Sequence, residues 1–289
     1  MSESKPERTP PAGVDTTRPS VARVYDYYLD GTANWPIDRE FGNRVLEQFP
    51  LLKSIALANR LFLNRVVRHL TKLGVRQFLD IGAGVPTAGN THQVAAETAA
   101  DTRVVYVDND PMAVAHGKML LDEQGDPRLH AVIEGDLRAP DELWQKAIAT
   151  GVLDPGEPVA LLLIAVLHVH QPGPDGQDMG AQAVGRYREL LPPGSFLAIS
   201  HITDEGVPDE LGPKLVELKR MYDTSSSSNV IWRPRAEIDA LFGGFEILPP
   251  GTVWTPEWHP EETGPNARPI TFDSPSHAAI WVGVGKKTG

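Results

Sequence analysis

Two glycines and one aspartate form the pattern in this chain that most clearly indicates chemistry. Gly82 and Gly84 follow a short apolar run at residues 77–81, and Asp108 directly follows a second apolar run at residues 103–107. Glycine lets a ligand approach the backbone closely, because a Cβ atom would collide with it. An acid that ends the second strand can accept hydrogen bonds from both hydroxyls of a ribose. The pattern therefore predicts a site for a nucleoside.

The residues after the second glycine indicate which nucleoside binds there. A dinucleotide site usually has a third glycine in register, but Thr87 stands at that position and the next glycine is Gly89. Pro86 would also keep a helix from starting directly after the turn, which weakens the case for a pyrophosphate at a helix N-terminus. A ligand with one ribose and no phosphate fits better. S-adenosylmethionine (SAM) is such a ligand, and NAD remains the alternative.

Further candidate residues follow the third and fourth predicted strands. Asp136 and Leu137 come after a strand at residues 129–133, where the acid would accept from the adenine amino group and the leucine would pack on the ring. Residues 159–166 form a continuous apolar run that is typical of a central parallel strand. Ala165, near its end, would lie beside the methionine portion of SAM. Three strand ends thus converge on one crevice, as at a topological switch point.

Two histidines, His168 and His201, are candidates for catalysis. Histidine titrates near neutral pH, so either residue can serve as a general base toward an acceptor hydroxyl. The alternative for His168 is a hydrogen-bonding role in the wall of the pocket. His168 and His170 would point to the same side of an extended segment, but no third ligand is near in the sequence, so we predict no metal site.

The segment at residues 21–29 is rich in aromatic residues and precedes the first strand. Tyr25 either packs in the core or belongs to a lid whose ring faces attract the sulfonium cation and exclude water. Arg23 either binds the methionine carboxylate or pairs with an acid at the surface.

These candidates need a sheet to position them, and the hydrophobic pattern predicts one. Three helices come first, at residues 21–29, 37–49 and 54–73. Strands then alternate with helices, and five strands are expected at residues 77–81, 103–107, 129–133, 159–166 and 195–200. Two late strands, at residues 245–248 and 277–284, are expected to pair antiparallel at the edge. The sequence predicts an α/β, Rossmann-like fold with a mostly parallel, seven-stranded twisted sheet, an antiparallel edge strand and an N-terminal helical cap.

Composition narrows the classes of function. The chain has 289 residues, a formal net charge of −11 and no cysteine. The charge argues against nucleic acid as a partner, and the missing cysteine excludes a thiolate nucleophile. No apolar run is long enough for a membrane span, and we expect a cytoplasmic protein. We predict a disordered tail at residues 1–19, a helical cap at residues 20–74 and a SAM-binding domain at residues 75–289.

Several motifs resemble the actinobacterial S-adenosyl methyltransferase family, formerly a domain of unknown function. They are ARVYDYYLDG, QFLDIGAGVPTAGNTHQVA, VYVDNDPMAVAHGKMLL, GDLRAP and LLPPGSFLAISH. The resemblance covers residues 19–287 and implies a class I methyltransferase fold that binds SAM. The candidate cofactor-binding residues are then Arg23, Tyr25, Asp80, Gly82, Ala83, Gly84, Thr87, Asn90, Asp108, Asn109, Asp136, Leu137 and Ala165.

The expected reaction is direct transfer of the sulfonium methyl group to a small-molecule acceptor through oxygen or nitrogen. The fourth strand does not end in an Asn-Pro-Pro-Tyr-type motif, which argues against an enzyme that methylates DNA amino groups. A non-catalytic regulator that binds SAM or S-adenosylhomocysteine (SAH) and an NAD-dependent oxidoreductase are the alternatives. The sequence predicts neither the acceptor nor the oligomeric state.

Overall fold

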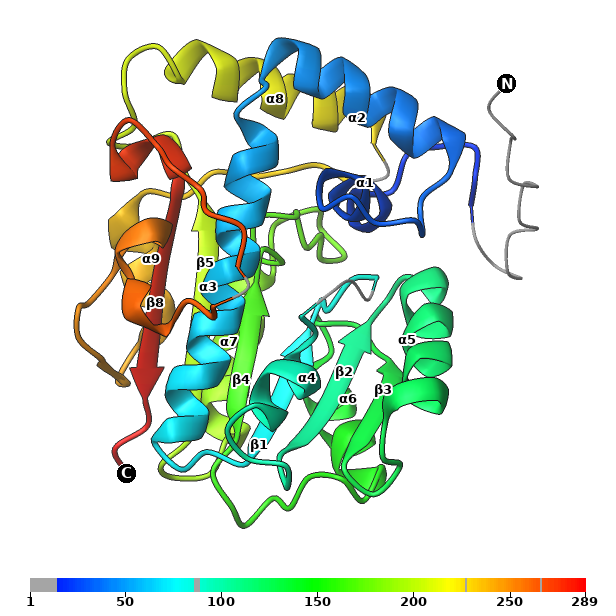
Figure 1. Cartoon of the computed structure of the whole chain (residues 1–289), viewed down its shortest axis with the longest axis vertical. Helices are drawn as coiled ribbons and strands as arrows, with labels where there is room; N and C mark the ends of the chain where they lie inside the picture. The colour runs from blue at the N-terminus through cyan, green and yellow to red at the C-terminus, as the bar shows by residue number, and fades with distance from the viewer. Residues whose placement is uncertain (1–14, 86–88, 227, 266) are drawn as a thin grey trace.

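The computed structural model describes residues 15–85, 89–226, 228–265 and 267–289. These residues form an eight-stranded sheet with the order β3-β2-β1-β4-β5-β8-β6, and β7 pairs with β8 beside this path (Figure 1). Strands β1 to β5 are parallel, whereas β8 runs antiparallel to β5. The strands are β1 (Gln77–Ile81), β2 (Arg103–Asp108), β3 (His130–Glu134), β4 (Ala160–Ile164), β5 (Phe196–Ile202), β6 (Glu246–Ile247), β7 (Val253–Trp254) and β8 (Ile280–Lys286).

The predicted fold is confirmed, but the sheet has eight strands instead of the seven expected, and several strands begin or end at other residues. Strand β4 ends at Ile164, because Ala165 has a φ of 57° and breaks the extended backbone. Strand β8 starts at Ile280, because Pro275–Ala278 form a 3₁₀ helix. The two-residue strand β7 was not predicted, since two residues show no periodicity. It joins the sheet by pairing with β8.

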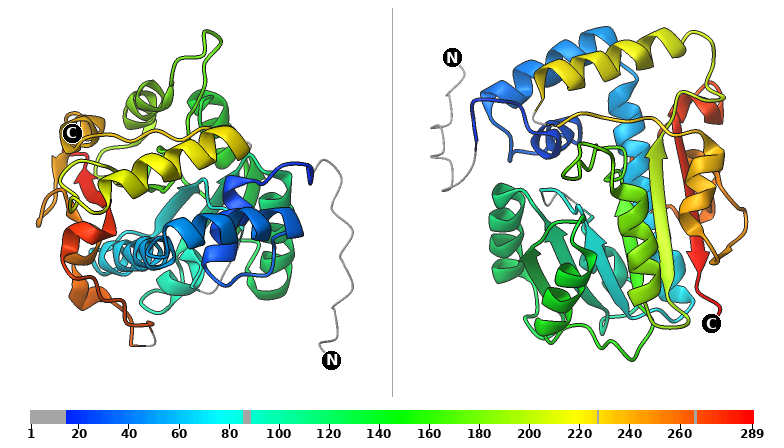
Figure 2. Two further views of the ribbon diagram at one scale, coloured as in Figure 1. Left: turned by 90° about the horizontal axis from the view of Figure 1, so that it is seen from above. Right: turned by 180° about the vertical axis from the view of Figure 1, so that it is seen from behind.

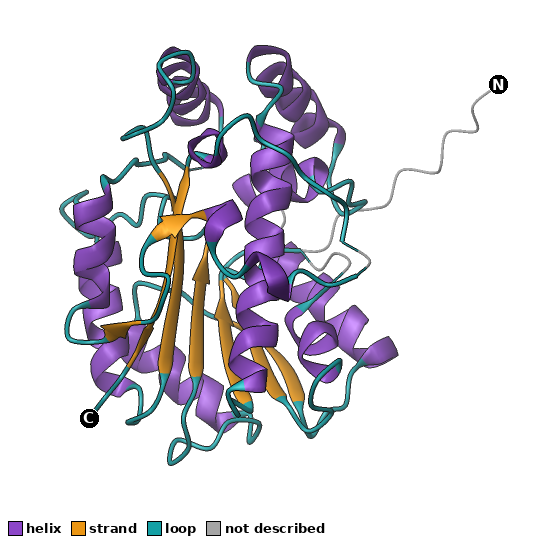
Figure 3. Cartoon of the chain, turned by 60° about the vertical axis from the view of Figure 1, so that its left-hand side comes forward, coloured by secondary structure: helices purple, strands orange, loops and turns teal. Residues whose placement is uncertain are grey.

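Helices cover both faces of the sheet, as Figures 2 and 3 show. In β1, Phe78 packs with α3 and α4 on one face, and Leu79 packs with α6 and α7 on the other. This alternation follows from the two-residue period of a strand. The helices are α1 (Val21–Tyr28), α2 (Pro36–Gln48), α3 (Leu52–Lys72), α4 (Thr91–Ala96), α5 (Pro111–Gln124), α6 (Pro140–Ala149), α7 (Gly180–Leu190), α8 (Gly212–Ser225) and α9 (Arg235–Phe242).

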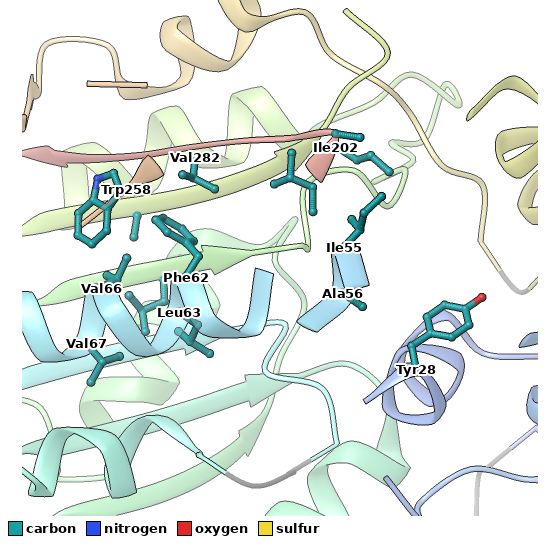
Figure 4. Packing of buried hydrophobic residues seen from close by; sticks show 14 of the residues in the cluster. Tyr28, Ile55, Ala56, Phe62, Leu63, Val66, Val67, Ile202, Trp258 and Val282 are labelled. Atoms are coloured by element: carbon teal, nitrogen blue, oxygen red, sulfur yellow. The ribbon is translucent and has the colours of Figure 1, made fainter. Parts of the chain in front are cut away.

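The long helix α3 packs lengthwise on the sheet and links it to the N-terminal helices. Phe62 and Val66 of this helix are fully buried and face Val282 of β8 (Figure 4). The ring of Phe62 meets the edge of Trp258 at a centroid distance of 5.3 Å. Such an edge-to-face pair is favourable because the rings carry opposite partial charges at edge and face. Helix α3 is therefore fixed against the sheet, and its first turns are held near the carboxyl ends of the strands.

Helices α1, α2 and α8 lie beyond the carboxyl ends of the parallel strands (Figure 1). Helix α2 packs beside α8, and α1 packs against both α2 and α3. Tyr28 of α1 and Tyr222 of α8 join their hydroxyl groups at 3.2 Å. These helices form a roof over the sheet edge at which strand-end side chains gather.

Candidate active site

A cavity of about 510 Å³ lies between the carboxyl ends of the central strands and the helical roof. This volume is within the range of small-molecule sites. Its floor comes from the segments after β1, β2 and β4, and its upper wall comes from α1 and the middle of α3. The crevice beyond the carboxyl ends of parallel strands is where open α/β sheets usually bind ligands.

The glycine turn after β1 forms part of the floor. Gly82 and Gly84 have φ angles of 72° and 67°, in the left-handed region that favours glycine. A Cβ atom on Gly82 would lie 2.5 Å from the side chain of Val166, whereas one on Gly84 would meet no heavy atom of the described residues within 4 Å. Gly82 thus allows the segment after β4 to pack closely, and Gly84 keeps space open at the cavity wall. Ala83 lines the cavity between them.

Asp108 lies beside this turn, with only 7% of its surface exposed. Its carboxylate accepts hydrogen bonds from the backbone N–H of Gly84 at 2.8 Å and of Asp110 at 2.9 Å. Burial raises the pKa of Asp108 from 3.8 to about 6, although these backbone hydrogen bonds oppose the shift. A carboxylate has about four lone-pair positions, so two backbone bonds leave acceptor capacity for a ligand.

Asp80 lines both the main cavity and a small recess beside the glycine turn. Asp80 is buried and accepts from the hydroxyl of Thr91 at 2.7 Å, and burial raises its pKa. Asn90 caps α4 and lies in this recess, not in the main cavity. Arg60 of α3 lines both spaces, and its Nη2 donates to Asn90 Oδ1 at 3.3 Å.

Arg60 is not among the site residues predicted from the sequence. The available signal was a charged residue between apolar positions of α3, which also fits a residue on a solvated helix face.

The two predicted site residues that follow β3 face different spaces. Leu137 lines the main cavity, but the Asp136 carboxylate lines a separate surface pocket. Arg138 donates to Asp136 through Nη2 at 2.6 Å and through Nε at 3.0 Å. It also donates to the carbonyl of Pro172 at 2.7 Å. The Asp136 carboxylate is therefore already bound by Arg138. The structure brings Leu137, but not this carboxylate, to the cavity. Asn109 lines both spaces.

The two candidate histidines are close together but only one lines the cavity. His168 lines it, and its Nδ1 has no hydrogen-bond partner among the described residues. Burial, with a smaller effect of Arg233, lowers the pKa of His168 to about 4, so its ring is neutral at pH 7. His201 is fully buried behind it, at a ring centroid distance of 5.8 Å.

Both ring nitrogens of His201 are satisfied inside the protein. Nδ1 lies 2.7 Å from the carbonyl oxygen of Ile202, and Nε2 lies 2.6 Å from Nη1 of Arg233. A neutral ring that donates from Nδ1 and accepts at Nε2 fits these partners. Burial lowers the pKa of His201 well below its ordinary value. His201 therefore supports the wall behind His168 and does not reach the cavity.

Arg23 and Tyr25 of α1 line the upper wall. Arg23 donates from Nε to Asp38 at 2.8 Å and from Nη2 to the carbonyls of Asp15 and Arg18, both at 3.0 Å. The Tyr25 hydroxyl donates to the carbonyl of Ala56 at 3.1 Å. Arg23 thus holds the chain that precedes α1 at the rim of the cavity.

The last two predicted site residues are Ala165 and Thr87. Ala165 lines the cavity with a left-handed backbone, and its N–H donates to the Ser200 hydroxyl at 2.9 Å. Such a conformation is strained for a residue other than glycine and is often found at functional sites. Thr87 lies outside the described residues.

Two searches of the described residues concern other classes of site. No group of three or more histidine, aspartate or glutamate side chains in this part of the chain is placed to hold a metal ion. None of its helices is both long and apolar enough to span a membrane.

Comparisons with known proteins identify relatives over nearly the whole chain. A family model described as S-adenosyl methyltransferase matches residues 7–288. A crystal structure from Thermobifida fusca, described provisionally as a methyltransferase, is 35% identical, with a TM-score of 0.82, and covers 97% of this chain and 99% of its own. A DUF574 family protein from Streptomyces avermitilis is 34% identical, with a TM-score of 0.82, and covers 94% of this chain and 99% of its own.

More distant structures share the fold alone. An O-methyltransferase family protein from Burkholderia thailandensis is 12% identical, with a TM-score of 0.50, and covers 86% of this chain and 71% of its own. No curated protein matches the sequence significantly.

Proposed function

Because the chain belongs to the S-adenosyl methyltransferase family and is therefore a SAM-dependent methyltransferase, we propose that SAM binds in the cavity beneath α1 and that the acceptor is a small molecule with a nucleophilic oxygen or nitrogen. The observation that carries the proposal is the buried Asp108 carboxylate beside the open side of Gly84. There, one carboxylate and a backbone without a side chain meet at the floor of a cavity of suitable size.

The residues of the cavity fit SAM in chemical type. Asp108 keeps acceptor capacity for the ribose hydroxyls, and Leu137 offers an apolar surface for the adenine ring. With the Asp136 carboxylate occupied by Arg138, we assign no adenine contact to it. When bound, SAM supplies an electrophilic methyl group on a sulfonium centre. Tyr25 presents an aromatic side chain to the cavity, and aromatic faces attract such cations.

The main catalytic contribution of the chain is positioning. Methyl transfer is an in-line displacement, so aligning the acceptor within near-attack distance supplies much of the rate enhancement. His168 is the cavity-lining candidate for orienting the acceptor, because its neutral ring can accept a hydrogen bond from a hydroxyl or an amine. A strongly lowered pKa makes it a weak base, so we assign it orientation first and proton acceptance second. His201, which is buried behind it, would fix the ring of His168.

The size and charge of the protein support a small acceptor. The cavity of about 510 Å³ has helices and loops around it, and the net charge of −11 disfavours a polyanionic partner. A phenol, an alcohol or an amine of modest size suits such a site.

The first experiment is a thermal-shift comparison of SAM, SAH and NAD on the full chain. We expect SAM and SAH to raise the melting temperature and NAD to leave it unchanged. The Asp108→Ala variant should lose the response to SAM and SAH. A shift with NAD alone, or an unchanged response in the variant, would contradict the assigned ligand.

The second experiment measures SAH production from SAM with a panel of phenols, alcohols and amines. Acceptor-dependent turnover supports the proposed reaction class. Tight SAH binding with no turnover across a broad panel would favour the non-catalytic regulator instead. His168→Ala is the matched variant, because it should lower turnover while SAH binding persists.

A further inference from the structure

Four arginines line the cavity, and they differ in whether a carboxylate within the protein pairs with them. Arg23 is paired with Asp38 at 2.8 Å, and Arg138 is paired with Asp136 at 2.6 Å. Arg18 is exposed to solvent at the rim. The fourth, Arg60, lies on α3 and is only partly exposed.

Arg60 has no ion-pair partner within the described residues. It makes a single hydrogen bond there, the 3.3 Å contact from Nη2 to Asn90 Oδ1, and its buried Nε has no partner. Burial raises the pKa of Asp80 and the charge of Arg60 lowers it to a smaller extent, but the Asp80 carboxylate accepts its hydrogen bond from Thr91 and not from Arg60. A partly buried guanidinium with five N–H donors and one long hydrogen bond is costly unless an anion completes it.

The place of Arg60 indicates which anion this is. Arg60 and Asp108 line the same two spaces, the main cavity and the small recess beside the glycine turn. A nucleoside held at Asp108 would therefore lie in a space that Arg60 also lines, where an anionic group attached to it can meet the guanidinium. A guanidinium can bind a carboxylate through two parallel hydrogen bonds, which gives both charge and shape selectivity.

We propose that Arg60 binds the α-carboxylate of the methionine portion of SAM, and that it makes the protein select ligands that carry this carboxylate. The inference rests on the proposed function. Arg23, for which the sequence left open either this role or pairing with an acid, is less suited to it. Its Nε and Nη2 are committed to Asp38 and to the carbonyls of the chain before α1.

The test compares SAH with decarboxylated SAH, which keeps the amino group and lacks only the carboxylate. Binding of both ligands is measured by calorimetry on the wild type, Arg60→Gln and Arg60→Lys. Arg68→Gln is the control, because Arg68 lies on the same helix, does not line the cavity and pairs with Glu97 at the surface. Thermal melts without ligand show whether each variant is folded.

We expect Arg60→Gln to weaken SAH binding about 10- to 100-fold, the range for losing a hydrogen bond to a charged group. Decarboxylated SAH should change by less than about twofold on the same reasoning, since it has no group for Arg60 to hold. The SAH affinity of Arg60→Lys should lie between those of the wild type and Arg60→Gln, because lysine keeps the charge but lacks the planar guanidinium. Arg68→Gln should match the wild type for both ligands.

Two results would overturn the inference while the proposed function stands. Equal weakening of both ligands in Arg60→Gln would mean that Arg60 only supports the glycine turn. Unchanged SAH affinity in that variant would place the carboxylate elsewhere. A wild-type protein that binds neither ligand would instead refute the proposed function itself.

Discussion

Replacing Asp108 with asparagine should stabilise the protein, relative to the wild type, more at neutral pH than at acid pH. Burial raises the pKa of this carboxyl from 3.8 to about 6 in the folded protein. Between about pH 4 and 6 the folded state therefore keeps a proton that the unfolded chain has released. The state that binds more protons loses stability as pH rises, so the wild type is destabilised at this residue across that window.

The size of the effect follows from the shift. About two pKa units at 1.36 kcal/mol each give roughly 3 kcal/mol, and most of this is lost between about pH 4 and pH 7. Asparagine does not titrate, so Asp108→Asn lacks this dependence. The asparagine side chain has one acceptor oxygen, so it loses one of the two hydrogen bonds from the backbone N–H groups of Gly84 and Asp110. The free-energy cost of that lost bond is the same at every pH.

Urea denaturation of both proteins across this pH range measures the effect. The quantity of interest is the difference in unfolding free energy between variant and wild type, because it cancels the other titrating groups. We expect this difference to shift in favour of the variant by about 2–3 kcal/mol from pH 4 to pH 7. A shift below about 0.5 kcal/mol would mean that the Asp108 carboxyl is well solvated without ligand, and the reasoning would be wrong.

The effect of Asp108 on ligand affinity should have the opposite pH dependence to its effect on stability, because affinity should rise with pH. In the proposed complex the ionised Asp108 carboxylate accepts from both ribose hydroxyls, so SAH affinity of the wild type should fall about tenfold per pH unit below pH 6. Calorimetry of Asp108→Asn should show weak binding without this slope. A wild-type affinity that stays constant from pH 5 to pH 7 would show that the ionised form of Asp108 is not needed.

Three further predictions follow from burial and backbone geometry. Gly82→Ala should destabilise the protein by more than about 2 kcal/mol, because the new Cβ meets Val166, whereas Gly84→Ala should cost about 1–2 kcal/mol from its φ alone and weaken SAH binding; equal melting temperatures of the two variants would contradict this. The ratio of kcat for wild type and His168→Gln at saturating SAM should stay constant from pH 6 to pH 8, because the pKa of His168 is about 4; a change in this ratio near pH 6.5 would show an unperturbed histidine. Phe62→Ala should lower the unfolding free energy by about 3–5 kcal/mol in denaturation experiments, and a loss below about 1 kcal/mol would mean that the α3 contact with the sheet is loose.

The succession of strands along the chain and the place of Asp108 at the end of the second strand were predictable because they depend on local patterns. Apolar runs of strand length, separated by helical periods, fix the parallel order, and the chain then has to deliver the residue after β2 to the sheet edge. Ala165 could be placed beside the same edge by this reasoning. The left-handed backbone of Ala165 could not be predicted, because nothing in the side chain of alanine favours that conformation.

The partners of charged side chains were not predictable from the pattern. Asp136 has the expected position after β3, yet Arg138, two residues later, binds its carboxylate. Arg23 is committed to Asp38, which reaches it from the next helix. His201 ends up behind His168 because Arg233 arrives from a distant loop. Each outcome depends on which partner is nearest in space, and strand order alone does not contain that information.

The charges around the cavity also bear on the choice between SAM and a dinucleotide. Five carboxylates line it, from Asp15, Asp26, Asp80, Asp108 and Asp110, whereas Arg60 is the partly buried cation there without an ion-pair partner among the described residues. A pyrophosphate would bring two negative charges into this surrounding, where Arg23 and Arg138 are already paired with carboxylates and Arg18 is exposed to solvent at the rim. SAM brings a sulfonium cation, an ammonium group and one carboxylate, so the acidic side chains and Arg60 would each meet an opposite charge. The electrostatics of the cavity therefore favour SAM on grounds that are independent of the off-register glycine after β1.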